Sequence, residues 1–292
     1  MTRTVLRFMI AALLLSLLFG CSADLPYYAQ SLGGHLRIVS ARQPVEELVD
    51  DPSKPALLRA QLALASDIRR YATEELALPD NDSYRSYVDT GRDYVTWAVF
   101  AAPELSSQAR IWCFPIYGCV PYRGYFSEEK ANRFAAQMRQ EGYDVYVGGI
   151  TAYSTLGRIS DPLLNTMFRR DETYLAGLVF HELAHQKVYV EDDTAFNEAF
   201  ATAVETSGVE RWLNARGDGA ALRRYKADRK RQTDFLELVT TARNELKAAY
   251  ASESGEAQKR AAKAAIIEDL RARYRRVRDN RWGGFPGYDA WF

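Results

Sequence analysis

The stretch ETYLAGLVFHELAHQKVYV, residues 172–190, constrains the fold more than any other part of the chain. Its apolar residues recur at helical spacing and Gly177 is its one glycine, so it predicts a long, buried helix that starts at Asp171. Two of the chain's three histidines, His181 and His185, lie four residues apart within it. Residues at this spacing share one face of a helix, one turn apart. The element that packs on this face must therefore accommodate two imidazole rings.

A second helix follows almost at once. The acidic residues 191–193 end the first helix, and Thr194 can cap a helix that stops at Gly217. This second helix carries Glu198 and Glu205. The short connection predicts that the two helices pack antiparallel to one another.

The motif HELAH, residues 181–185, indicates a zinc site. His181 and His185 can direct two nitrogens at one ion, while Glu182 can hold a water there and accept its proton as general base. A carboxylate from the second helix would be the third ligand and leave the fourth position open. The rise per residue puts Glu198 and Glu205 at similar distances from the expected metal position, so both are candidates. The alternative is a structural helix that carries two histidines by chance.

The remaining pattern predicts an α+β fold that is dominated by helices and has a small mixed sheet. Residues 25–80 form a helical part, 90–217 the sheet and metal-site part, and 220–292 a part made of charged helices. The expected elements are helices over 27–49, 55–78, 128–142 (capped by Ser127) and within 222–278, a hairpin of strands 94–102 and 109–114, and a strand over 143–154.

The amino-terminal residues predict an exported protein. Arg3 and Arg7 precede an apolar run over residues 8–19, which is too short to span a bilayer comfortably and is typical of a secretory signal. We therefore expect a signal peptide over 1–20 and one domain over 21–292. Lys and Arg together number 38, as do Asp and Glu, so the absence of net charge does not favour a nucleic-acid partner.

Cys113 and Cys119 flank a short segment of WCFPIYGCVPYRGYF. In an exported protein the oxidising compartment favours a disulfide that closes this loop. Their use as metal ligands is the alternative, but the spacing lacks a CxxC pair.

Three sequence features resemble known families. The end of the signal, LLFGC, resembles the lipobox of bacterial lipoproteins, which implies cleavage before Cys21 and lipidation of that residue. Ser22 follows Cys21, and an aspartate at this position would imply retention in the inner membrane. The resemblance therefore implies a lipid anchor on the periplasmic side of the cell envelope, in the outer membrane rather than the inner. The pair HELAHQ and NEAFATAVE resembles the zinc site of gluzincin aminopeptidases, in which the glutamate after asparagine is the third ligand.

This second resemblance implies that Glu198 is the third zinc ligand. Glu205 lies two turns further along the same face and would hydrogen-bond a ligand histidine, or serve as the alternative ligand. Fewer residues separate His185 from Glu198 than in gluzincins, and the chain has no GAMEN-like segment to hold a free amine.

The third resemblance covers most of residues 94–205. WCFPIYGCVPYRGYF, TAYSTLGRISDPLLNTM and the two zinc motifs, together with WGGFPGYDAW near the end, resemble a family of bacterial lipoproteins described as putative aminopeptidases. The resemblance implies a zincin-like metallopeptidase fold and a carboxyl-terminal segment longer than the one that ends at Phe292.

Zincins bind an extended peptide along an edge strand above the metal. Ala152, Tyr153 and Ser154 end a strand that precedes the histidine helix, so they are candidate substrate-binding residues, with an internal strand as the alternative. The sequence thus predicts a zinc-dependent peptidase, with Zn²⁺ as cofactor and a peptide as substrate, that removes amino-terminal residues. A zinc endopeptidase and a non-catalytic zinc-binding envelope lipoprotein are the alternatives.

Overall fold

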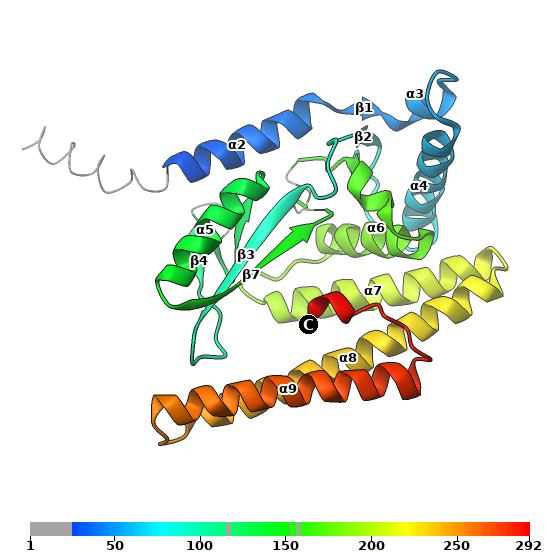
Figure 1. The fold of residues 1–292 in the computed structure, drawn as a ribbon. Helices are drawn as coiled ribbons and strands as arrows, with labels where there is room; N and C mark the ends of the chain where they lie inside the picture. Colours follow the sequence, from blue (N-terminus) through cyan, green and yellow to red (C-terminus); the bar gives the residue numbers. More distant parts are fainter. Residues whose placement is uncertain (1–24, 115–117, 153, 156, 158) are drawn as a thin grey trace, which may run out of the picture.

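The computed structural model describes residues 25–292 except 115–117, 153, 156 and 158. The predicted signal peptide over 1–20, the lipidation site Cys21 and the candidate substrate residue Tyr153 lie outside the described residues. Figure 1 shows a helix-dominated α+β fold in which small sheets lie among the helices. Within the described residues, no helix combines the length and the hydrophobicity that crossing a membrane requires.

From Leu25 onward, the described amino-terminal part contains three helices: α2 (Leu25–Ser40), α3 (Val45–Asp50) and α4 (Ala56–Glu74). The prediction of one helix over 27–49 is wrong, because the chain leaves α2 and forms the short strand β1 (Gln43–Pro44) before α3 begins. Pro44 explains the break, since proline has no N–H for a helical hydrogen bond and restricts the residue before it. The predicted helix over 55–78 ends earlier, at Glu74.

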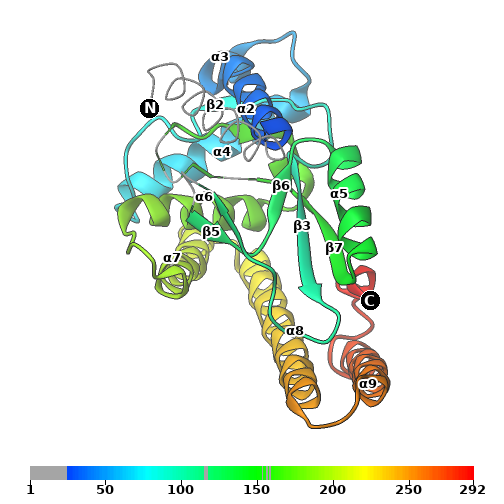
Figure 2. The same cartoon turned by 90° about the vertical axis from the view of Figure 1, so that its left-hand side faces the viewer.

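The larger sheet has the strand order β6-β3-β7, and all its pairs are antiparallel. Its strands are β3 (Thr96–Pro103), β6 (Arg123–Tyr125) and β7 (Tyr143–Ile150). Helix α5 (Glu128–Gln140) covers one face of this sheet (Figure 2). Val99 of β3 and Ala131 and Ala135 of α5 belong to one buried apolar cluster. Ser127 caps α5 as predicted, by accepting a hydrogen bond from the backbone of Lys130.

The predicted hairpin of strands 94–102 and 109–114 is wrong. Strand β4 (Trp112–Phe114) pairs with β5 (Gly118–Val120), and β3 pairs with β6 and β7. Cys113 and Cys119 face each other across β4 and β5 and are joined by a disulfide. This covalent bond closes a two-stranded hairpin that is separate from the larger sheet.

The third sheet was not predicted. It has the order β1-β2-β8, with β1 antiparallel and β8 parallel to the central strand. Strands β2 (Ser86–Val88) and β8 (Leu163–Leu164), like β1, are too short for hydrophobic periodicity to reveal them. The 3₁₀ helix η1 (Asn165–Arg169) follows β8 and leads toward α6.

The predicted helix pair is present as α6 (Glu172–Lys187) and α7 (Thr194–Ala215). The carboxylate of Asp171 caps α6 by accepting a hydrogen bond from the backbone of Tyr174. Helix α7 is capped by Asp193 and not by Thr194, which is its first helical residue. Both helices contribute to the largest apolar core, in which Phe180, Leu183 and Leu213 are fully buried.

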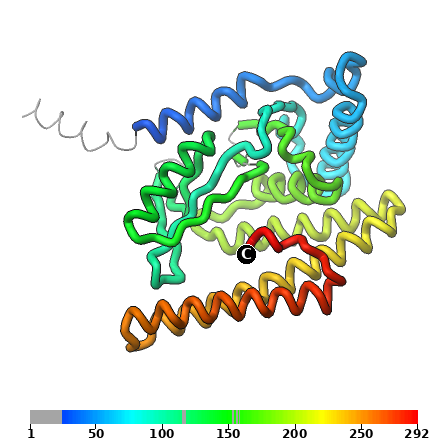
Figure 3. The backbone as a smooth tube through the Cα atoms, in the orientation of Figure 1, coloured from blue at the N-terminus to red at the C-terminus, as the bar shows by residue number. Residues whose placement is uncertain are grey.

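The chain ends in a long helical hairpin of α8 (Gly219–Ala251) and α9 (Glu256–Arg281). Figure 3 shows that the segment after α9 turns back toward the rest of the molecule. It contains the 3₁₀ helix η2 (Asp289–Trp291), and its rings pack on the hairpin, with Tyr288 stacked on Phe235 at 4.1 Å between ring centroids.

Candidate metal centre

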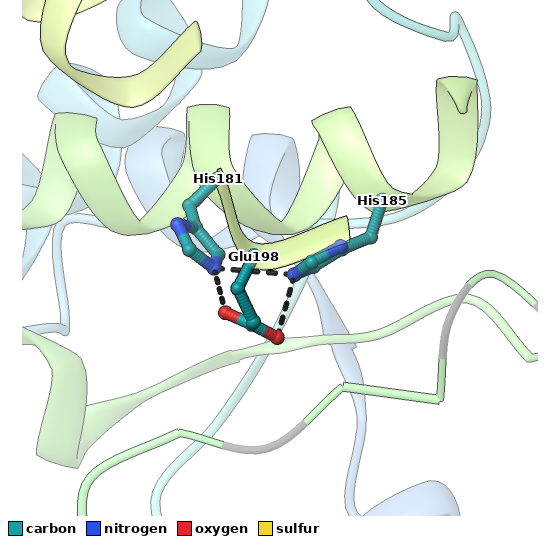
Figure 4. Close-up of side chains that lie close together, drawn as sticks. All are labelled: His181, His185 and Glu198. Carbon is teal, nitrogen blue, oxygen red and sulfur yellow. Dashed lines mark hydrogen bonds and ion pairs between the residues drawn. The ribbon is translucent and has the colours of Figure 1, made fainter. Parts of the chain in front are cut away.

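The histidine face of α6 meets one carboxylate of α7 (Figure 4). The Nε2 atoms of His181 and His185 are 3.1 Å apart. Glu198 places Oε2 3.4 Å from Nε2 of His181 and Oε1 3.5 Å from Nε2 of His185. The three residues offer ligand atoms that all lie within 4.8 Å of one another. The structure therefore brings Glu198, rather than Glu205, to the side on which both Nε2 atoms point.

Asn197 explains how Glu198 reaches this position, and the sequence reasoning overlooked it. Its buried side chain accepts a hydrogen bond from the backbone N–H of Val190 at 2.8 Å and donates one to the carbonyl of the same residue at 2.7 Å. The two bonds tie the first turn of α7 to the connection after α6. Glu198, the next residue, is thereby held opposite the histidines.

Glu205 lies on the other side of His181. Its Oε2 is 3.0 Å from Nδ1 of His181, and its Oε1 is 3.9 Å from Nη1 of Arg229 on α8. A carboxylate cannot donate when ionised, so Nδ1 carries the proton and Nε2 keeps the lone pair that a metal needs. A carboxylate behind a ligand histidine is a common arrangement that fixes the orientation of the ring.

The two histidines have different surroundings. Burial lowers the pKa of His181, but the hydrogen bond that it donates to Glu205 and the charges of the neighbouring carboxylates outweigh burial and raise the pKa overall. Burial, followed by the charge of His181, lowers the pKa of His185. Nδ1 of His185 is buried and has no hydrogen-bond partner among the described residues. His185 is therefore favoured as a neutral ligand, the form that binds metals.

The ligand set fits zinc. Zinc binds histidine nitrogen and carboxylate oxygen at about 2.0–2.2 Å in tetrahedral geometry, which places neighbouring ligand atoms about 3.4 Å apart. The two Nε2 atoms, 3.1 Å apart, are close to this value. Each of them lies 3.4–3.5 Å from a different oxygen of Glu198, so the carboxylate faces both histidines. Two histidines and one glutamate with a fourth position open is a ligand set of catalytic zinc sites.

Glu182 lies beside these ligands and is partly buried. Burial raises its pKa, while the charge of His181 and a hydrogen bond with Ser154 act in the opposite direction. The hydroxyl of Ser154 also donates to Oδ2 of Asp161 at 3.0 Å. A carboxylate with a raised pKa is suited to exchange protons near neutral pH.

Of the predicted substrate residues, Ala152 and Ser154 are described, and both lie just beyond the strand that was expected to contain them. Strand β7 ends at Ile150 and is at the edge of its sheet. Ala152 packs against the main core, and Ser154 faces Asp161 and Glu182. Their role in substrate binding stays a prediction.

Tyr122 is a second residue that the sequence reasoning missed. Partial burial raises the pKa of its phenol, and the charges of Glu198 and Glu182 raise it further, so the hydroxyl stays protonated at neutral pH. Its ring lies 5.6 Å from that of Phe100 on β3. The one local signal was its position shortly after β5, the second strand of the disulfide-closed hairpin.

The fold and the site define a helix-dominated α+β protein with two histidines and a glutamate arranged to hold one metal ion. A family model described as "Putative aminopeptidase" matches residues 26–292, so the chain belongs to that family. A comparison with curated proteins and one with solved structures each gave no match.

Proposed function

We propose that this protein is a zinc-dependent peptidase that removes amino-terminal residues from peptides. The convergence of His181, His185 and Glu198 beside the carboxylate of Glu182 carries the proposal. The family description, which names an aminopeptidase, supports the choice of an exopeptidase. The fold is then a zincin-like one, in which the HExxH motif lies on the central helix α6.

Each residue has a distinct role in the proposed reaction. A zinc ion held by His181, His185 and Glu198 would supply Lewis acidity, which lowers the pKa of water and polarises the substrate carbonyl. Glu182 accepts the proton of the attacking water and delivers it to the leaving amine. Glu205 keeps the proton of His181 on Nδ1, so that Nε2 stays available to the metal.

The test combines metal analysis with a panel of fluorogenic peptides. The mature chain is purified, its zinc content is measured, and matched substrates with free and with acetylated amino termini are compared. Hydrolysis of only the free-amine substrates supports the aminopeptidase, and hydrolysis of both kinds supports an endopeptidase. A chain that binds zinc and cleaves neither is a binding lipoprotein, and a chain without zinc affinity contradicts the whole assignment.

We also propose that the protein is anchored in the bacterial cell envelope through a lipid on Cys21. The signal-like residues and the lipobox resemblance support this location, on the periplasmic side and in the outer membrane. Several acyl chains hold a protein on a membrane far better than one. Cys21→Ser should move the protein into the aqueous phase in detergent partitioning, and a variant that remains in the detergent phase would require another anchor.

A further inference from the structure

The contact between α6 and α7 contains a feature that the proposed chemistry does not use. Gly177 lies one turn before His181 on α6, so both residues lie on the same face of the helix. A methyl group at position 177 would lie 3.2 Å from Cγ, 3.3 Å from Oε1 and 3.5 Å from Cδ of Glu205. The first two contacts are closer than such atoms comfortably make, and the third is an ordinary van der Waals contact. The Glu205 side chain therefore lies against bare helix backbone.

Glu205 has little freedom to move away. Its Oε2 is fixed at 3.0 Å from Nδ1 of His181, and its Oε1 faces Arg229 at 3.9 Å. The oxygen that faces Arg229 is the same one that a methyl at position 177 would approach. Displacement of this carboxylate would change its bond to His181, and with it the direction of the metal-binding Nε2.

The other glycine of the helix pair provides a contrast. Gly208 on α7 faces apolar side chains, and a methyl there would lie 2.8 Å from Cδ1 of Leu76 and 2.8 Å from Cδ2 of Phe180. This glycine accommodates the packing of the core. Of the glycines in α6 and α7, Gly177 is the one that makes room for a charged side chain next to the metal ligands.

We propose that Gly177 is a positioning residue of the metal centre: its missing side chain makes the space in which Glu205 orients His181. This inference rests on the proposed zinc site but concerns a residue that contacts neither the metal nor the substrate. Alanine is favoured over glycine in a helix, so the substitution Gly177→Ala has opposite expected effects on the helix and on the site.

The experiment measures zinc affinity by chelator competition and thermal unfolding of the zinc-free chain. Gly177→Ala should weaken zinc binding about tenfold, in the range typical of changes behind a metal ligand, without lowering the unfolding midpoint. Gly33→Ala is the matched control, because Gly33 is also within a helix and a methyl there meets nothing within 4 Å. This control should bind zinc as the parent chain does.

A double-mutant cycle separates the proposed role from general packing. In a Glu205→Ala background, Gly177→Ala should cause no further loss of zinc affinity, because the group that it displaces is gone. An equal loss in both backgrounds, or parental affinity in Gly177→Ala, would overturn the inference. If Gly177→Ala does not fold, the double variant with Glu205→Ala should fold. A double variant that also fails to fold would show that the space at position 177 serves packing alone. A parent chain without zinc affinity would instead refute the proposed function.

Discussion

The helix pair α6–α7 and the helical hairpin α8–α9 are both antiparallel, yet different interactions hold them. Eight of the sixteen residues of α6 are buried, including the ligand His185. Helix α8 buries five of its 33 residues and α9 two of its 26. Charged pairs connect the hairpin to itself and to the sheet, among them Arg273 with Glu245 and Arg260 with Glu104.

The difference shows where the fold can hold a side chain to a fixed direction. Close packing around α6 restricts the rotamers of the residues next to His181 and His185, as a metal centre requires. Exposed ion pairs restrain less, because water and salt compete with them. The chain thus places its candidate chemistry on the best-packed pair of helices. Substitutions in the two regions should therefore differ in the size of their effects.

The largest expected effect concerns Glu182. Glu182→Gln removes the proton acceptor but keeps the shape of the side chain, so hydrolysis should fall about 10²- to 10⁴-fold while bound zinc is retained. Steady-state kinetics and metal content measure the two quantities. Glu191→Gln, the same change at an exposed position between α6 and α7, is the control and should hydrolyse peptides normally. Turnover close to that of the parent chain in Glu182→Gln would refute the assignment.

Next in size is the difference between the two carboxylates of α7. Glu198→Ala removes a ligand and should weaken zinc binding more than 100-fold, whereas Glu205→Ala should weaken it about 10- to 100-fold. Glu210→Ala, further along the same helix and paired with Lys226, should leave zinc affinity unchanged. Tight binding in Glu198→Ala together with its loss in Glu205→Ala would exchange the two roles.

Core packing of the helix pair can be compared directly with the surface of the hairpin. Phe180 is fully buried, so Phe180→Ala should lower the free energy of unfolding by about 3–5 kcal/mol. Leu236 on α8 is 56% exposed, so Leu236→Ala should change it by no more than about 0.5 kcal/mol. Denaturant titration of both zinc-free variants tests the pair, and equal losses would remove the contrast drawn between the two regions.

Acid should loosen the hairpin through Asp234. The indole of Trp282 donates to its carboxylate at 3.0 Å, and this bond, followed by the charges of Arg281 and Lys230, lowers the pKa of Asp234. Because the pKa of Asp234 is lower in the folded chain than in the unfolded chain, its ionisation stabilises the folded chain above pH 3.8, the ordinary pKa. This stabilisation is lost as the pH falls through the lower pKa of the folded chain. Hydrogen exchange of α9 should therefore be slower in the parent than in Asp234→Asn at pH 6. In the zinc-free chains this difference should shrink as the pH falls from 3.8 through the lower, folded value, and a difference that does not change with pH would contradict this linkage.

The smallest effect is expected at the contact between the hairpin and the sheet. Arg260 forms an exposed pair with Glu104, 2.9 Å apart. Arg260→Gln should reduce the free energy of unfolding by at most about 1 kcal/mol, and added salt should diminish the difference from the parent. A loss of several kcal/mol that salt does not alter would show that this contact matters more than ordinary surface pairs.

The sequence was sufficient for elements with strong local signals. Helices α5 and α6 follow from their caps, Ser127 and Asp171, and from apolar spacing. Strands β1, β2 and β8 have two or three residues each, so their pairing depends on contacts between distant segments that no local pattern encodes. The strand over 109–114 was likewise expected to pair with the strand over 94–102, whereas β4 pairs with β5, because strand signals do not specify which strands pair.

The residues of the site also divide into those that a local pattern predicts and those whose position depends on distant contacts. The placement of His181 and His185 on one face follows from helical spacing, and the choice of Glu182 follows from the HELAH motif. The rise along α7 could not separate Glu198 from Glu205, because the rotation of that helix depends on the turn that Asn197 closes. Tyr122 approaches the site from a different part of the chain, and its position depends on how the sheet packs on the helices.

Three carboxylates, Glu182, Glu198 and Glu205, gather around two imidazoles in this fold. Like charges brought together repel one another, so a cation bound among them would favour the folded chain over the unfolded one. By mass action, the equilibrium between the two states would then depend on the concentration of free zinc. A melting temperature for this protein would be a property of the chain and its buffer together, and the availability of metal in its compartment would set how long the chain survives proteolysis.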